Sequence, residues 1–126
     1  MSANTHRYES AVARYFEAWN TSEPEARAKA VAAAWAVGGG YTDPLADAVG
    51  HDGIAAVIAA AHEQFPGFAF RITGPVDGHH DTARFSWELV GEDGSAPVAG
   101  SDVITLDGNG RIRTVYGFLD RVPAGA

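Results

Sequence analysis

The sequence contains no cysteine, which excludes disulfide bonds, thiolate nucleophiles and cysteine-based metal sites. It also lacks an uninterrupted apolar run of about 18 residues, the length that a membrane-spanning helix needs. Residues Met1 to Arg7 are polar and carry no apolar segment of the kind found in secretion signals. We therefore expect a cytoplasmic protein that does not enter a membrane.

Basic side chains are in the minority. The chain has 9 lysines and arginines against 16 aspartates and glutamates, which gives a formal net charge of -7. Such a balance repels phosphate backbones and anionic lipid surfaces. We therefore exclude nucleic acid as a partner, and a membrane surface on the same ground.

The length of 126 residues suits one hydrophobic core, and 46% of the residues are hydrophobic. We expect a single domain over residues 1–126. A second module for a cofactor would not fit in this length, and no phosphate-binding loop is present, so we expect no cofactor.

The first part of the chain has helical periodicity. Apolar residues recur every three or four positions from Thr5 to Trp19, which predicts one helix. The segment Ser22 to Glu25 is typical of a capping box and predicts the start of a second helix. That helix runs to about Trp35, and the glycines at 38–40 are expected to stop it.

A short extended segment is expected at Tyr41-Thr42, because Pro44 favours the β conformation at Asp43. A loop through Gly50 follows. Asp52 is expected to cap a third helix, which Pro66-Gly67 ends.

The second half of the chain changes to the alternation of half-buried strands. We predict strands that start near Phe68, around Phe85 to Leu89, from about Pro97 to Leu106, and from Arg111 to about Val122. Asp77-Gly78 is expected to form a turn, and residues 107–110 a hairpin. Helices followed by adjacent antiparallel strands predict an α+β domain, with three N-terminal helices packed on a curved, mostly antiparallel sheet.

Asp102 is the most informative residue of the sequence. On its predicted strand it shares a face with the aliphatic residues Val98, Ile104 and Leu106, so it should be buried. A symmetric hairpin places it opposite Val115. A carboxylic acid in an apolar cavity has a raised pKa and can donate a proton near neutral pH. The alternative is a structural carboxylate that caps a loop or pairs with Arg84 or Arg113.

Two further positions could carry chemistry. Asp43 stands in a rigid Asp-Pro turn that fixes its carboxylate, although Asp-Pro is also a common turn. Tyr15 lies in the apolar stripe of the first helix, where its hydroxyl must bond to a buried partner or line a pocket. We expect an apolar ligand pocket, formed by Trp19, Phe65, Phe85, Trp87, Val115, Gly117 and Leu119.

The five histidines show no spacing typical of a metal site. His79 and His80 are adjacent in a turn, and His51 and His62 each lack a second histidine one helical turn away. We therefore expect no bound metal, and surface positions for His51 and His62.

The chain resembles the nuclear transport factor 2-like superfamily, which has a cone-shaped, cystatin-like α+β fold. Its members include ketosteroid isomerases, SnoaL-like polyketide cyclases and limonene-type epoxide hydrolases. The residues that carry the resemblance are Ala13-Arg14-Tyr15-Phe16, Trp19-Asn20, Tyr41-Thr42-Asp43-Pro44, Gly53-Ile54, Gly100-Ser101-Asp102 and residues 107–112.

The similarity to ketosteroid isomerases implies roles for three residues. Asp43 corresponds to the general base, while Tyr15 and an un-ionised Asp102 correspond to the oxyanion hole. It implies a cofactor-independent enzyme that acts on a small apolar carbonyl compound, as an isomerase or a polyketide cyclase. The alternative is a non-catalytic domain that binds a hydrophobic ligand or dimerises. The resemblance also implies a homodimer formed through an exposed sheet face with Ile112, Tyr116 and Phe118.

Overall fold

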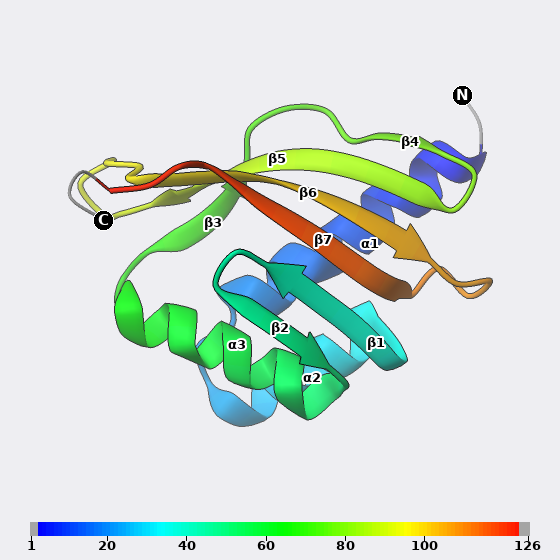
Figure 1. Cartoon of the computed structure of the whole chain (residues 1–126), viewed down its shortest axis with the longest axis horizontal. Helices are drawn as coiled ribbons and strands as arrows, with labels where there is room; N and C mark the ends of the chain where they lie inside the picture. The colour runs from blue at the N-terminus through cyan, green and yellow to red at the C-terminus, as the bar shows by residue number, and fades with distance from the viewer. Residues whose placement is uncertain (1–2, 124–126) are drawn as a thin grey trace.

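The computed structural model describes residues 3–123 (Figure 1). Within that range the helices are α1 (Ala3–Asn20), α2 (Pro24–Ala34) and α3 (His51–Gln64). The strands are β1 (Trp35–Asp43), β2 (Ala46–Val49), β3 (Ala69–Ile72), β4 (Asp77–His79), β5 (Thr82–Val90), β6 (Val98–Leu106) and β7 (Ile112–Arg121). None of the helices in these residues is long and apolar enough to cross a membrane.

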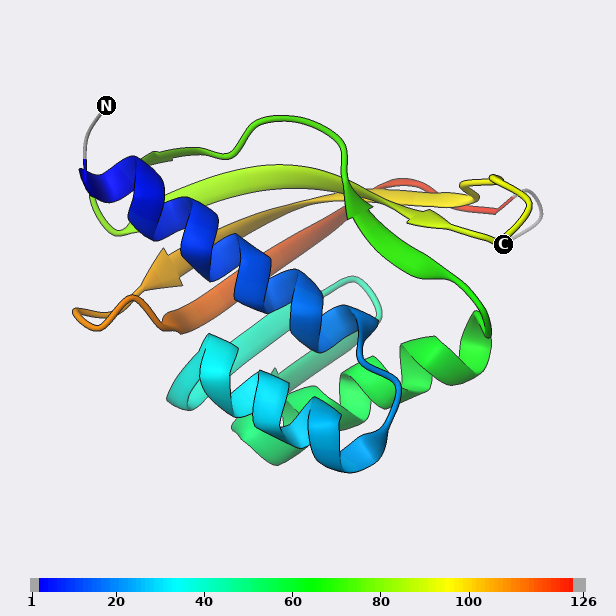
Figure 2. The same ribbon diagram turned by 180° about the vertical axis from the view of Figure 1, so that it is seen from behind.

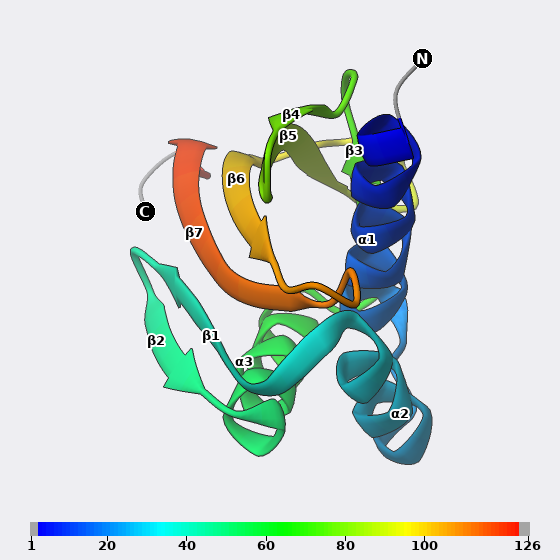
Figure 3. The ribbon, with the colours of Figure 1, turned by 90° about the vertical axis from the view of Figure 1, so that its right-hand side faces the viewer.

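The strands form one sheet in the order β2-β1-β7-β6-β5-β3, with β4 paired to β5. Only the β1–β7 pair is parallel among the strands of residues 3–123. Helix α1 crosses one face of the sheet, and α2 and α3 lie beside β1 (Figures 2 and 3). The prediction of an α+β fold with three N-terminal helices on a curved, mostly antiparallel sheet is confirmed.

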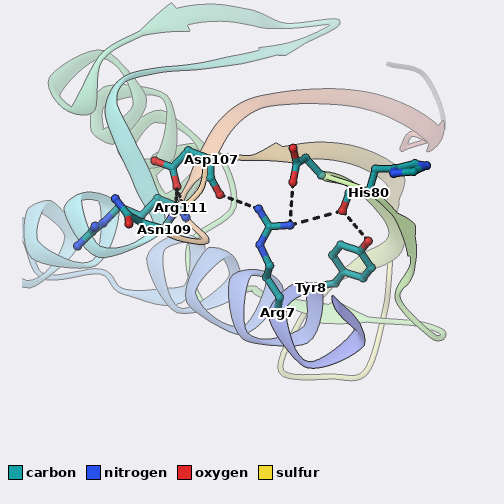
Figure 4. Close-up of polar contacts among 7 residues, drawn as sticks. Arg7, Tyr8, His80, Asp107, Asn109 and Arg111 are labelled. Atoms are coloured by element: carbon teal, nitrogen blue, oxygen red, sulfur yellow. Dashed lines mark hydrogen bonds and ion pairs between the residues drawn. The ribbon is translucent and has the colours of Figure 1, made fainter. Parts of the chain in front are cut away.

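Polar contacts at one end of the sheet fix the start of α1 (Figure 4). The Arg7 guanidinium donates to the carbonyl of Asp107 at 2.7 Å and pairs with Asp81 at 2.9 Å. The Tyr8 hydroxyl donates to the carbonyl of His80 at 2.7 Å. These bonds hold the first half of α1 against the β4–β5 and β6–β7 turns. The second half of α1 therefore extends over one face of the sheet, which we call its inner face.

The glycines at 38–40 do not stop a helix, contrary to the prediction. Helix α2 ends at Ala34, and the glycines lie inside β1, which is irregular between Trp35 and Gly40. Gly38 has a φ of +77°, and a Cβ on Gly39 would lie 3.1 Å from the carbonyl oxygen of Ile112. These positions favour glycine because β1 bends and lies close to β7.

Two short strands stand where the sequence predicted a loop and a turn. The predicted loop from Leu45 to Gly50 contains β2, which pairs with the second half of β1. Asp77-Gly78 belongs to β4, not to a turn. The two strands have four and three residues and no fully buried residue, so their patterns are too short to indicate a strand.

Both predicted helix caps were wrong by one or two residues. Glu23, not Ser22, caps α2, and its carboxylate accepts from the backbone amides of Glu25 and Ala26. Gly50 precedes α3, so Asp52 lies in the first turn and caps nothing. The carboxylate of Asp52 still lies near the positive end of the helix dipole.

The β6–β7 hairpin is not symmetric, because Asp107 organises its turn. The Asp107 carboxylate accepts from the amides of Asn109 and Arg111, and the register shifts between Thr105 and Leu106. Asp102 is therefore opposite Gly117, and the predicted pairing with Val115 was wrong.

The register shift also turns Ile112 inward. It is fully buried, whereas Tyr116 and Phe118 are 46% and 58% exposed. The predicted dimer surface therefore loses Ile112, and dimer formation stays a prediction.

Ile112→Ala should destabilise the protein by about 2–5 kcal/mol, because the truncation leaves a cavity in the core. Val37→Ala, at a position that is 93% exposed, should change the free energy of unfolding by less than about 0.5 kcal/mol. Urea denaturation measures both. Equal values for the two variants would place Ile112 on the outer face.

Candidate active site

A cavity of about 420 Å³ lies between α1, α3 and the inner face of the sheet. Its walls are mainly apolar, with alanines and Val57 of α3 on one side and aromatic rings of α1 and the sheet on the other. Five polar side chains other than tryptophan line it: Tyr15, Tyr41, Asp43, Gln64 and Asp102. None of the lining residues, all within the described range, carries a positive charge. The cavity therefore suits an uncharged, largely apolar ligand.

Asp102 is buried on the inner face of β6, as its strand position predicts, and is 2% exposed. The Tyr15 hydroxyl donates to its Oδ2 at 2.6 Å. Asp102 is not the arginine-paired carboxylate of the alternative interpretation. Among the described residues it forms no ion pair with Arg84 or Arg113, and Arg84 pairs with Asp77.

Burial raises the pKa of Asp102 to about 6. The Tyr15 hydroxyl and the Trp87 indole favour the ionised form and lower the pKa, while the charge of Asp43 raises it. The upward shift shows that desolvation outweighs the nearby donors.

Asp43 ends β1 with its carboxylate held on both oxygens. Oδ1 accepts the backbone amides of Leu45 and Ala46, each at 2.8 Å. Oδ2 accepts the hydroxyl of Tyr41 at 2.5 Å. The prediction that the Asp-Pro turn fixes this carboxylate is confirmed.

The two phenols of the cavity are both buried donors. Tyr15 is 2% exposed and Tyr41 is 5% exposed. Burial, together with the charge of Asp102, raises the pKa of Tyr15 well above the usual value. Burial and the hydrogen bond to Asp43 raise the pKa of Tyr41. Both hydroxyls therefore keep their protons at neutral pH.

Gly117 lets the two acids approach each other. It lies on β7, between β6 with Asp102 and β1 with Asp43. A Cβ at this position would lie 3.0 Å from Oδ1 of Asp102 and 3.1 Å from Cβ of Asp43. Only a residue without a side chain leaves both acids where they are.

Four of the seven residues predicted to form the ligand pocket line the cavity. Trp19, Phe65, Trp87 and Leu119 line the cavity, but Phe85, Val115 and Gly117 do not. Phe85 packs against the rings of Tyr15 and Phe16, Val115 is opposite Ile104 in the core, and Gly117 lies between the two acids.

Sequence reasoning missed the role of Tyr41 at this site. Its position two residues before Asp43, on the same strand face, was the signal that could have identified it. It also missed the small residues of α3, because alanines on a helix do not distinguish a cavity wall from close packing.

Within residues 3–123, no cluster of three or more histidine, aspartate or glutamate side chains could hold a metal ion. His51 and His62 are half-buried, contrary to the surface positions expected for them. Nε2 of His51 bonds to the carbonyl of Trp35, and Nε2 of His62 bonds to that of Trp19. Both histidines therefore connect helix α3 to the rest of the fold.

The raised pKa of Asp102 makes stability depend on pH. The folded protein keeps this proton to a higher pH than the unfolded chain does, so stabilisation is complete below about pH 4 and lost as the pH rises through 6. A pKa of about 6, against 3.8 for a free aspartate, corresponds to roughly 3 kcal/mol. Asp102→Asn has no proton to lose, so its stability relative to the wild type should rise by roughly that amount between about pH 4 and pH 8. Urea denaturation at both pH values measures this, and a constant difference would contradict the raised pKa.

A family model described as the SnoaL-like domain matches residues 12–115. A candidate isomerase of the SnoaL-like family from Agrobacterium tumefaciens strain C58 is 43% identical, with 91% of this chain and 98% of that chain covered and a TM-score of 0.87. A candidate SnoaL-like polyketide cyclase from Jannaschia sp. CCS1 is 18% identical, with 95% and 90% covered and a TM-score of 0.76.

A de novo designed protein with a curved β-sheet is 12% identical, with 95% of this chain and 88% of that chain covered and a TM-score of 0.70. No curated protein matches the sequence. The family model covers most of the chain, and the Agrobacterium protein is similar over nearly its whole length. This chain belongs to the SnoaL-like domain family of the nuclear transport factor 2-like superfamily, and has its cystatin-like fold.

Proposed function

We propose that this chain is a cofactor-independent isomerase, similar to ketosteroid isomerases, that moves a proton α to the carbonyl group of a small apolar compound. One observation carries the proposal: a buried phenol–carboxyl pair, Tyr15 and Asp102, shares an apolar cavity with a second, fixed carboxylate, Asp43. The 43% identity with a candidate isomerase supports the same reaction class.

The three residues would divide the reaction between them. Asp43 removes a proton from the carbon next to the carbonyl and returns it at another carbon. The electron pair moves to the carbonyl oxygen. Protonated Asp102 donates a hydrogen bond to this oxygen, and the Tyr15 hydroxyl turns from Oδ2 of Asp102 to donate its single proton to the same oxygen. Asp102 can donate only in its protonated form, and its raised pKa keeps part of the population protonated near neutral pH.

The cavity also supports the proposed substrate class. Its walls offer apolar contacts along most of their area, and four of its five polar side chains other than tryptophan form the Tyr15–Asp102 and Tyr41–Asp43 pairs. An anionic substrate would meet two acids and no cation. The same donors could serve a cyclisation through an enolate, as in a polyketide cyclase, but the cyclase neighbour is only 18% identical and supports the fold alone.

The base role is tested with Asp43→Asn and a β,γ-unsaturated ketone, such as a small steroid enone. Loss of a general base should lower kcat/KM by about 100- to 10,000-fold, because the amide cannot accept the proton. Asp47→Asn is the matched control, since Asp47 is an exposed aspartate on β2 outside the cavity. Formation of the conjugated enone is followed by its ultraviolet absorbance.

An Asp43→Asn variant with full activity would remove Asp43 from the mechanism. If the wild type binds the enone and does not convert it, the chain is instead a non-catalytic ligand-binding domain.

The oxyanion role predicts a pH profile. Because only protonated Asp102 donates, kcat/KM should fall as the pH rises through about 6, by about tenfold per pH unit at higher pH. Asp102→Asn keeps an N–H donor that does not titrate, so its activity should be lower at the optimum and should not show this fall. A fall that persists in Asp102→Asn would assign the titration to another group.

A further inference from the structure

The hydrogen bonds of Asp43 leave one acceptor position free. A carboxylate has about four acceptor positions, two on each oxygen. The amides of Leu45 and Ala46 occupy both positions of Oδ1. The Tyr41 hydroxyl occupies one position of Oδ2. The remaining position belongs to Oδ2, on a residue that lines the cavity.

The donors to the two oxygens differ in origin. The amides that bind Oδ1 belong to the backbone of the β1–β2 hairpin, so they are present in any folded form of the chain. The donor to Oδ2 is a side chain, on the same face of β1 as Asp43. Tyr41 has little freedom to leave, since it is buried and its ring packs 5.5 Å from that of Trp19.

We infer that Oδ2 of Asp43 is the atom that takes the substrate proton, and that Tyr41 is the positioning residue that holds this oxygen at the cavity. The inference rests on the proposed isomerase function. In the step, the C–H bond breaks and an O–H bond forms at Oδ2. The electron pair moves to the carbonyl oxygen beside Tyr15 and Asp102. The proton then returns from Oδ2 to another carbon, and the carboxylate is restored.

The surroundings of Tyr41 favour this role over a purely structural one. Tyr8 shows what a structural tyrosine does in this fold, since its buried hydroxyl donates to a backbone carbonyl far along the chain, that of His80 (Figure 4). The hydroxyl of Tyr41 instead donates to a carboxylate that lines the cavity. Tyr41 also lies near enough to Tyr15 for the two phenols to affect each other's pKa. Tyr41 thus binds the proposed base and lies near the proposed oxyanion hole.

The first experiment compares Tyr41→Phe with Tyr8→Phe in the enone assay. Both substitutions remove one buried hydroxyl and keep the ring. Without its donor, Oδ2 is held only through the two amide bonds to Oδ1, so Tyr41→Phe should lower kcat by about 10- to 100-fold and change KM by less than about threefold. Tyr8→Phe should keep the wild-type kcat. Equal kcat values for Tyr41→Phe and the wild type would overturn the inference.

The second experiment asks whether Tyr41 acts through Asp43. In the Asp43→Asn background, Tyr41→Phe should have no further effect on the residual kcat, because the two residues act as one unit. An undiminished loss in that background would mean that Tyr41 supports substrate binding or folding instead.

A spectroscopic measurement separates the inference from the proposed function. The chain has four tyrosines, and ¹³C labelling at Cζ reports the hydrogen bond of each phenol. Asp43→Asn should shift the resonance of Tyr41 and leave that of Tyr8 in place. An unmoved Tyr41 resonance would overturn the inference. If Asp43→Asn shifts the Tyr41 resonance but the wild type converts no enone, the hydrogen bond exists and the proposed function is wrong. The proton-accepting role of Oδ2 is then wrong too.

Discussion

The candidate site depends on one hydrogen bond, from the Tyr15 hydroxyl to the buried carboxyl of Asp102. Burial of a carboxylate is unfavourable, and here it outweighs the donors around Asp102 and raises its pKa to about 6. The bond also joins α1 to β6, so the helix has a fixed place over the sheet. The contacts of Arg7 and Tyr8 at the other end of α1 support the same placement. The same hydrogen bond between Tyr15 and Asp102 therefore determines both the surroundings of the buried carboxyl and the position of α1.

The candidate site also requires that two acids far apart in the sequence lie close together. Asp43 and Asp102 stand on strands that are separated by β7, and the glycine at 117 provides the space between them. The parallel pairing of β1 with β7 is what brings the Asp-Pro turn to the inner face. The charge of Asp43 consequently contributes to the raised pKa of Asp102.

The sequence was most informative where a pattern is local. Period-two alternation placed Asp102 on the buried face, and the Asp-Pro pair predicted a fixed carboxylate at position 43. The pairing of Asp102 with Gly117 was not predictable, because it depends on how Asp107 arranges the hairpin turn. The glycines at 38–40 were predicted to stop a helix, but they lie in β1, which pairs with β7 far along the chain. The predictions that were wrong thus concern positions where tertiary contacts decide the local structure.

The fold by itself does not explain a reaction. A designed protein with a curved β-sheet has a similar fold at 12% identity, so the architecture can form without selection for this chemistry. The features of this chain that bear on chemistry are therefore its polar groups. Two phenol–carboxyl pairs line a largely apolar cavity, and one of the carboxyls has a pKa near 6. Burial of such groups is unfavourable for folding alone, since apolar residues of similar size could fill the space. Stability alone therefore does not account for these groups, and the proposal of proton transfer rests on them.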